Sequence, residues 1–437
     1  MSDSSPVVLA AYQCGPGMGS VSQIGWEWYR RLAARRPVTL VTHVRNRTAI
    51  EAAPDRPTQA DILYIDTEWL AAPLYRLARR LFPHSEHGMF MVSSLDFFAF
   101  DLQALRVLRR QRPQRNWSLV HVVTPVTLAA PSSLHRLGLP VVRGPLNCGL
   151  ESPPGFPELL RHEPPWLIRM RRFPALLDAV AGASRGCDAI LTATRATRAA
   201  VGARHRARCI DMVENGVDPA RFPAAAWPAA PGPSNPLRVL FVGRMIALKG
   251  VDMLLEAGAD LVAEGVPLEL TLVGDGPEHD AWQAKATALG IAAHTRFTGA
   301  LDAARVADEM RRCHVFCLPS VRESGGAVLL EAMASARPVI AVAHGGPAEL
   351  ADDSVGCLIP ATDTADVTAR LAAALASVVA DPTGWAARGR RGRLRVEAEF
   401  DWESKVSAAE AIYAKVIGAA SEEFALASQT GGAGAFQ

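Results

Sequence analysis

The alternation of short apolar runs with longer amphipathic stretches constrains the fold of this chain more than any other feature. In the first half, the runs lie at residues 7–12, 38–43, 62–66, 119–123 and 189–193. Strands that are buried on both faces of a parallel sheet have this continuous apolar character, and helical crossovers separate them along the chain. The first half is therefore predicted to be an α/β domain with a parallel sheet.

This alternation stops at residues 222–236 and then begins again. The segment contains five prolines and five alanines, which disfavour both a helix and a sheet strand. Six further apolar runs follow, so a second α/β domain is predicted. The predicted divisions are an N-terminal domain at 1–222, a linker at 223–236, a C-terminal domain at 237–400, a helix at 401–420 and a disordered tail at 421–437.

Composition excludes several classes of protein. A chain of 437 residues suits two domains, and a formal charge of +2 is not the signature of a nucleic-acid-binding protein. The start of the sequence lacks the basic region and long apolar core of a signal peptide, and no apolar run reaches the ~18 residues that span a bilayer. The seven cysteines form no regular framework. A cytoplasmic protein is therefore expected, with at most peripheral contact at the inner face of the membrane.

A glycine and two basic residues follow the first predicted strand of the second half. Gly243 ends the apolar run, Arg244 comes next, and Lys249 precedes a second glycine and a helical pattern. Ligands of open parallel sheets bind at the carboxyl ends of the strands, and two cations there suit a diphosphate. The alternative is that both are solvated loop residues.

A second candidate site lies between two predicted strands at residues 314–319 and 338–343. The turn Ser324-Gly325-Gly326 leads into a helix, where backbone amides and the helix dipole favour an anion. Glu323 precedes the turn, and Glu331 lies inside the helix, roughly 7 Å beyond Gly326 at ~1.5 Å per residue. Two carboxylates on either side of a bound diphosphate could accept hydrogen bonds from sugar and ribose hydroxyls. A lone glutamate would more often lie on a solvated helix face.

The combination resembles the retaining family 4 glycosyltransferases, whose signature is two glutamates separated by seven residues. Here these are Glu323 and Glu331. The resemblance covers essentially the whole chain. One departure is the turn Ser324-Gly325-Gly326, where the family more often has an aromatic residue followed by glycine, which puts the contacts to the donor sugar in question. Further matches lie at residues 15–26, 119–125, 214–222, 243–250, 272–277, 319–324, 331–341, 345–350 and 399–413.

The resemblance implies the GT-B fold, in which two Rossmann-like domains face each other across a cleft. The donor, a nucleotide diphosphate sugar, would bind the C-terminal domain, and a glycan or lipid-linked acceptor mostly the N-terminal one. The terminal helix would cross back onto the first domain. Transfer would retain the anomeric configuration and require neither a metal ion nor a cofactor.

The resemblance also implies roles for individual residues. Arg244 and Lys249 would bind the diphosphate and stabilise it as it leaves, while Glu323 would bind the donor sugar and Glu331 the ribose. Amides of Gly325 and Gly326 would face the phosphates. The remaining residues expected to contact the donor are Gly17, Gly19, Gly243, Gly274 and Ser324.

The first half contains weaker signals with open alternatives. Gly17 and Gly19 follow the first strand and would either approach the phosphates or form a tight turn. The spacing G-x-G-x-G and the absence of an acid after the second strand disfavour a dinucleotide-dependent oxidoreductase. His121 lies in an apolar run. It is a core residue or, by its family position, a catalytic residue near the donor sugar.

Two further groups of residues are noted. Cys313, His314 and Cys317 lie in and beside an apolar run without a second ligand pair, so packing is expected and a metal site is not. The basic stretch at 161–173 contains interleaved apolar residues, and would either contact anionic lipid or form a solvated helix. The alternatives to a glycosyltransferase are a nucleotide-sugar epimerase or phosphorylase on the same fold, or a degenerate transferase that acts as a binding protein.

Overall fold

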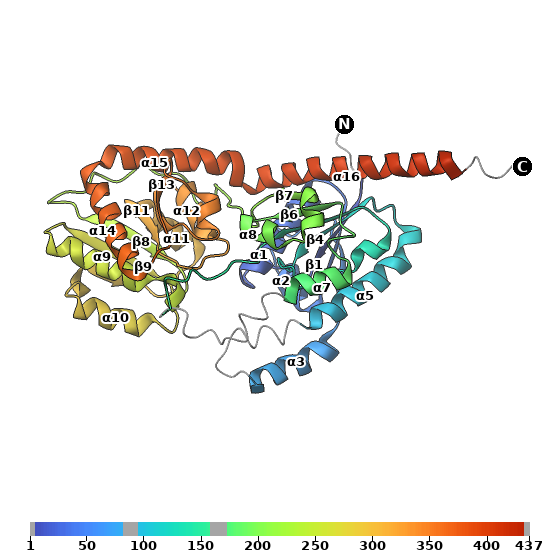
Figure 1. Ribbon diagram of the computed structural model, residues 1–437, viewed down its shortest axis with the longest axis horizontal. Helices are drawn as coiled ribbons and strands as arrows, with labels where there is room; N and C mark the ends of the chain where they lie inside the picture. Colours follow the sequence, from blue (N-terminus) through green and yellow to red (C-terminus); the bar gives the residue numbers. More distant parts are fainter. Residues whose placement is uncertain (1–4, 82–94, 158–172, 432–437) are drawn as a thin grey trace, which may run out of the picture. The chain divides into compact units, whose positions relative to one another are not determined.

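The structure is a computed structural model that describes residues 5–81, 95–157 and 173–431 (Figure 1). The chain divides into two compact units. Unit 1 comprises Met1–Gly149, Arg169–Glu214 and Val406–Gln437, and unit 2 comprises Leu150–Ile168 and Asn215–Lys405. Each unit contains a parallel sheet, which confirms the expected α/β class.

Unit 1 is built on a seven-stranded parallel sheet in the order β3-β2-β1-β4-β5-β6-β7. Two of its strands were not predicted. One contains Gly144 and Pro145, which are unusual in a strand, and the other is only three residues long. The strands are β1 (Val7–Ala11), β2 (Val38–His43), β3 (Asp61–Ile65), β4 (Leu119–Thr124), β5 (Val141–Leu146), β6 (Ala189–Thr192) and β7 (Cys209–Asp211).

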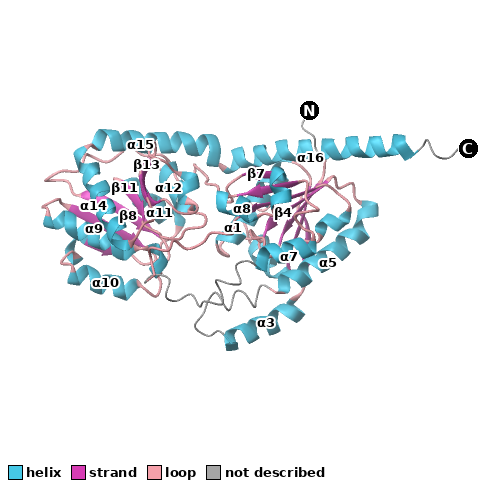
Figure 2. Cartoon of the chain, in the orientation of Figure 1, coloured by secondary structure: helices cyan, strands magenta, loops and turns pink. Residues whose placement is uncertain are grey.

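Helices pack around this sheet (Figure 2). The first helix buries Trp26, Trp28 and Tyr29 against the strands, which explains the aromatic residues in its sequence. The helices of unit 1 are α1 (Ser20–Arg35), α2 (Arg47–Glu51), α3 (Glu68–Leu81), α5 (Asp96–Gln111), α7 (Phe173–Ala181) and α8 (Arg195–Ala200).

Unit 2 contains a six-stranded parallel sheet in the order β10-β9-β8-β11-β12-β13. All six strands were predicted from the apolar runs. They are β8 (Leu237–Val242), β9 (Leu268–Val273), β10 (Thr295–Phe297), β11 (Val315–Leu318), β12 (Val339–Val342) and β13 (Gly356–Ile359). The helices are α9 (Val251–Ala263), α10 (His279–Ala288), α11 (Ala303–Arg312), α12 (Ala327–Ala334), α13 (Pro347–Leu350), α14 (Thr364–Ala380) and α15 (Pro382–Arg395), followed by a π-helix (Val396–Phe400).

The proline-rich segment 223–236 belongs to unit 2, whose longer stretch begins at Asn215. The Trp227 indole donates a hydrogen bond to the carbonyl of His314 (2.8 Å), and the buried Arg337 guanidinium donates to the carbonyl of Ala226 (3.0 Å). The segment predicted as a linker is thus bound to unit 2, because the carbonyl of Ala226 supplies one of the hydrogen bonds that the buried Arg337 needs.

Helix α16 (Trp402–Gly431) belongs to unit 2 up to Lys405 and to unit 1 from Val406. Its fully buried Val406 and Tyr413 anchor it to unit 1. This helix was expected to end at residue 420 and to be followed by a disordered tail, but it continues to Gly431. Residues 421–430 are mostly good helix formers without glycine or proline, which accounts for the extension. Among the described residues, no helix is both long and apolar enough to cross a membrane.

Candidate functional site

The sheet of unit 2 has its switch point between β8 and β11. From β8 the chain proceeds to β9 on one side, and from β11 to β12 on the other. The loops that follow these two strands therefore meet at the carboxyl edge of the sheet, where open α/β sheets bind ligands. The predicted donor-binding residues of the second half lie in these loops, in the loop after β9 and in helix α12.

An ion pair joins the two central loops. Lys249 Nζ, after β8, contacts Glu323 Oε2, after β11, and the two side chains are only 18% and 15% exposed. The other oxygen of Glu323 accepts a hydrogen bond from the amide of Gly326 (3.3 Å), the residue that directly precedes helix α12. One carboxylate thus lies between a lysine ammonium and the positive end of a helix, two groups that attract an anion.

Glycines let the loops approach one another closely. Gly274 has φ +136°, and a β-carbon there would lie 1.9 Å from the carbonyl oxygen of Gly243. Gly345, after β12, has φ +69°, and a β-carbon there would lie 2.2 Å from the carbonyl oxygen of Glu323. The amide of Gly346 donates to that same oxygen at 2.8 Å. The backbone of Glu323 is therefore held by the loop after β12, which the sequence alone did not indicate.

Gly345→Ala should displace Glu323 as well as destabilise the fold. An alanine in the left-handed region costs about 1–2 kcal/mol by itself, and here its β-carbon also meets backbone. Gly265→Ala is the matched control, since Gly265 has φ +81° and a β-carbon there would meet no atom within 4 Å. Urea unfolding should show a loss for both variants, and nucleotide diphosphate titration a loss for Gly345→Ala alone. Equal binding by the two variants would contradict this assignment.

Glu331 lies on α12 and is partly buried. Burial raises the pKa of its carboxyl group to about 7, and the nearby charge of Arg221 opposes this shift. Within the described ranges, no side chain or backbone group donates a hydrogen bond to this carboxylate. A half-desolvated carboxylate of this kind suits a ligand that brings its own hydroxyl donors.

The other predicted donor-binding residues are placed as follows. Arg244 is exposed in the loop after β8. Gly17 and Gly19 lie in the loop between β1 and α1 of unit 1, with φ +72° and +102°, and a β-carbon on either would meet no atom within 4 Å. Their conformation favours glycine, and the space beside them is open in unit 1.

The expectation that His121 is catalytic is wrong. Its ring is fully buried in β4; Nε2 hydrogen bonds to the carbonyl of Gly144 (2.7 Å) and Nδ1 to the hydroxyl of Tyr413 (2.6 Å). Burial lowers the pKa of His121 to about 4. With both nitrogens occupied inside unit 1, the residue holds helix α16 on the sheet and is not available to a substrate.

His314 of unit 2 is likewise a packing residue. One of its ring nitrogens accepts a hydrogen bond from the amide of Arg238, and the other bonds to the carbonyl of Ala229.

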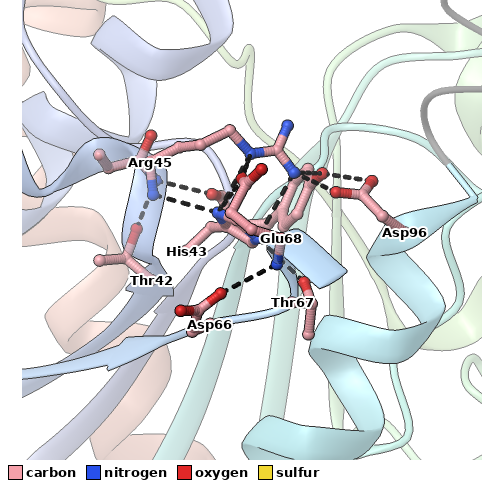
Figure 3. Close-up of polar contacts among 9 residues, drawn as sticks. Thr42, His43, Arg45, Asp66, Thr67, Glu68 and Asp96 are labelled. Carbon is pink, nitrogen blue, oxygen red and sulfur yellow. Dashed lines mark hydrogen bonds and ion pairs between the residues drawn. The ribbon is translucent and has the colours of Figure 1, made fainter. Parts of the chain in front are cut away.

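A polar cluster lies at the carboxyl ends of β1, β2 and β3 in unit 1 (Figure 3). Its centre is Arg45, which pairs with Asp96 at the start of α5 and, through Nε at 2.9 Å, with Glu68 at the start of α3. Tyr12 donates to the other oxygen of Asp96 (2.6 Å). Asp96 is completely buried, and Arg45 is 44% exposed.

His43 completes this cluster. Its Nδ1 accepts a hydrogen bond from the amide of Arg45 (3.1 Å), and its Nε2 lies 2.9 Å from the hydroxyl of Thr67. Burial, followed by the charge of Arg45, lowers the pKa of His43 to about 4, so the ring stays neutral at pH 7. This cluster was not predicted, although polar residues directly after three predicted strands were a usable signal. The basic stretch at 161–173 lies outside the described residues except for its last position.

Parts of this sequence are similar to the sequences of known proteins. Residues 227–391 match the family described as glycosyl transferases group 1. The glycogen synthase of Mycobacterium tuberculosis is 33% identical over 205 residues, which cover 47% of this chain and 48% of that enzyme. The phosphatidyl-myo-inositol mannosyltransferase of Mycolicibacterium smegmatis is 37% identical over 215 residues, which cover 48% and 53% of the two chains. The chain thus spans about half the length of the curated relatives it matches.

Among solved structures, Anabaena HepE in complex with UDP is similar, with a TM-score of 0.63 and 15% identity over 94% of this chain and 100% of that one. At this identity the likeness shows the fold alone. It confirms the expected GT-B fold.

Proposed function

We propose that this chain, in which residues 227–391 form a glycosyl transferases group 1 domain, is a retaining glycosyltransferase that uses a nucleotide diphosphate sugar. The observation that carries the proposal is the grouping of Lys249, Glu323 and the N-terminus of α12 at the switch point of unit 2. A site with a lysine, a carboxylate and the N-terminus of a helix suits a sugar joined to phosphate, because it has partners for both.

In this proposal the donor spans α12. The diphosphate binds to the side chains of Lys249 and Arg244 and to the amides of Gly325 and Gly326. The loops around it are shaped by Ser324, Gly243 and Gly274. Glu323 accepts hydrogen bonds from the sugar and Glu331 from the ribose. Gly17 and Gly19 contribute backbone amides from unit 1, whose remaining surface binds the acceptor.

The proposed reaction proceeds on one face of the sugar. The acceptor hydroxyl forms the new bond to the anomeric carbon as the bond to the diphosphate breaks, and its proton passes to a phosphate oxygen. Lys249 and Arg244 stabilise the charge that develops on the leaving diphosphate, and Glu323 orients the sugar. Because these cations supply the positive charge, we expect transfer without a divalent metal.

Transfer is tested in EDTA with a panel of nucleotide sugars chosen by thermal shift, since a ligand that binds only the folded state raises the melting temperature. UDP is the first candidate because a similar structure contains it. Release of glycosylated acceptor and free nucleotide diphosphate supports the proposal. Epimerisation of the donor without acceptor, or binding without turnover, would assign the site to another function.

Nucleotide binding should depend on pH through Glu331. Only the ionised carboxylate accepts two hydroxyl donors, and its pKa of about 7 leaves it largely protonated at pH 6. Affinity should therefore rise by up to about tenfold from pH 6 to pH 7.5, because binding must release that proton. Titration of Glu331→Gln separates this effect from the titration of the phosphate itself, near pH 6. Identical pH profiles for the variant and the native chain would contradict the role of Glu331.

We further propose that the enzyme acts in the cytoplasm, at the inner face of the membrane, on a glycan or lipid-linked acceptor. All seven cysteines are unpaired and most are buried, as expected in a reducing compartment. One relative is named for transfer to a lipid, the phosphatidyl-myo-inositol mannosyltransferase, and this supports a lipid-linked molecule as the acceptor. Detection of transfer to a lipid extract, against transfer to soluble glycans, tests the choice.

A further inference from the structure

Helix α3 of unit 1 exposes large aromatic side chains. Trp69 is 72% exposed and Tyr75 is 49% exposed. Ala71 is buried against the unit, while Leu70 and Leu74 are partly buried. The helix therefore packs on unit 1 by its buried side and contacts α5 (Figure 1). The exposed side, which includes Trp69 and Tyr75, is its outward face. Single exposed apolar residues are common, whereas a group of them on one surface marks an interaction site.

The same helix carries three exposed arginines. Arg76, Arg79 and Arg80 lie in its second half, and among the described residues no carboxylate pairs with any of them. Glu68, the one acidic residue of the helix, is engaged by Arg45. At ~100° per residue, Trp69, Arg76 and Arg80 fall on one stripe, with Arg79 beside it and Tyr75 next to Arg79. The outward face thus combines aromatic rings with three arginines that have no carboxylate partner in the part of the chain that the structure describes.

We propose that this face of α3 binds the surface of an anionic lipid bilayer. Tryptophan and tyrosine rings are stable at the depth of the headgroups, and arginines extend to the phosphates around them. An apolar protein partner would leave the three arginines without counter-charges. A second copy of this chain would bring two sets of arginines together, which is unfavourable. Among these occupants, only an anionic surface satisfies both the rings and the charges.

The position of α3 links this surface to the chemistry of unit 1. The helix follows β3 directly, and its first residue belongs to the cluster around Arg45 at the carboxyl end of the sheet (Figure 3). A bilayer bound to α3 lies close to the edge of unit 1 that is expected to bind the acceptor. That lipid-linked molecules are the acceptors rests on the proposed function, whereas binding of the bilayer rests on α3 alone.

The experiment is flotation of the full chain with vesicles of phosphatidylcholine alone or mixed equally with phosphatidylglycerol. The native chain should float with the anionic vesicles and be released by high salt. Each basic side chain near an anionic surface strengthens binding about fivefold. The triple variant Arg76→Glu, Arg79→Glu, Arg80→Glu should therefore bind at least about 100-fold more weakly. Trp69→Ser with Tyr75→Ser should also lose binding, at physiological salt.

Matched controls lie on unit 2. Leu394→Ser removes an apolar side chain that is 64% exposed on α15, and Arg311→Glu with Arg312→Glu reverses exposed charges on α11; neither change should alter flotation. Equal flotation of the α3 variants and the controls, or no flotation of the native chain, would overturn the proposal. The proposal would also be overturned if light scattering showed that the native chain is a dimer that does not bind vesicles and that dissociates when Trp69 is replaced by serine. None of these measurements requires transfer activity, so failure here leaves the proposed function standing.

Discussion

Replacing Glu323 by alanine should lower the rate of sugar transfer by about 100-fold or more while leaving the affinity for nucleotide diphosphate unchanged or slightly higher. A sugar that is held loosely reaches the reactive geometry less often, and misplacement by about 1 Å can cost such a factor. The diphosphate loses nothing, because the variant frees the ammonium of Lys249 and the amide of Gly326 from the carboxylate that now occupies them. Calorimetric titration beside transfer kinetics measures both quantities.

Lys249→Ala is the comparison for this experiment. It removes a charged hydrogen-bond donor from the diphosphate and leaves Glu323 as a nearby negative charge. Nucleotide diphosphate binding should weaken by about 1.5–3 kcal/mol. Glu323→Gln keeps the shape of the side chain without its charge, and should resemble Glu323→Ala in binding but retain more transfer. If Glu323→Ala weakened the nucleotide diphosphate as much as Lys249→Ala does, the separate roles of sugar and phosphate contacts would be wrong.

Asp96→Ala should destabilise unit 1 by about 3 kcal/mol. Removing one partner of a buried ion pair typically costs about 3–5 kcal/mol, and the lower end applies because Arg45 is partly exposed. The variant also leaves the buried hydroxyl of Tyr12 without its acceptor. Urea unfolding followed by circular dichroism measures the loss in the transition that belongs to unit 1.

Asp211→Ala provides a surface control for Asp96→Ala. Asp211 pairs with Arg198 at 3.0 Å, but the two side chains are 72% and 41% exposed, so water replaces the interaction. Its loss should cost about 1 kcal/mol or less. A similar destabilisation by both variants would mean that the cluster around Arg45 stabilises no more than a surface ion pair does.

The local sequence was sufficient to predict most of the strands and the loops that follow them. The runs that form β8 and β9 are apolar at five and four of their six positions, because both faces of a central parallel strand are mostly buried. Gly243 and Gly274 could be located for the same reason, since they follow these runs directly, and the turn before α12 could be located because it comes after the run that forms β11. Strand β5 escaped prediction because Gly144 and Pro145 interrupt it, and the extent of helix α16 because residues 421–430 show no clear apolar face.

Tertiary structure decided which side chains are free to act. An apolar run around a histidine looks the same whether the ring faces a substrate or the core, and the partner that fixes His121 in the core, Tyr413, lies 292 positions away. The pair of Lys249 with Glu323 spans 74 positions, and it exists because strand order places β8 beside β11. Residue types and their spacing thus determined the fold and the set of side chains that could take part in chemistry. Contacts between distant segments determined which of these side chains can reach a ligand, because only the packed chain sets burial and the distances between charges.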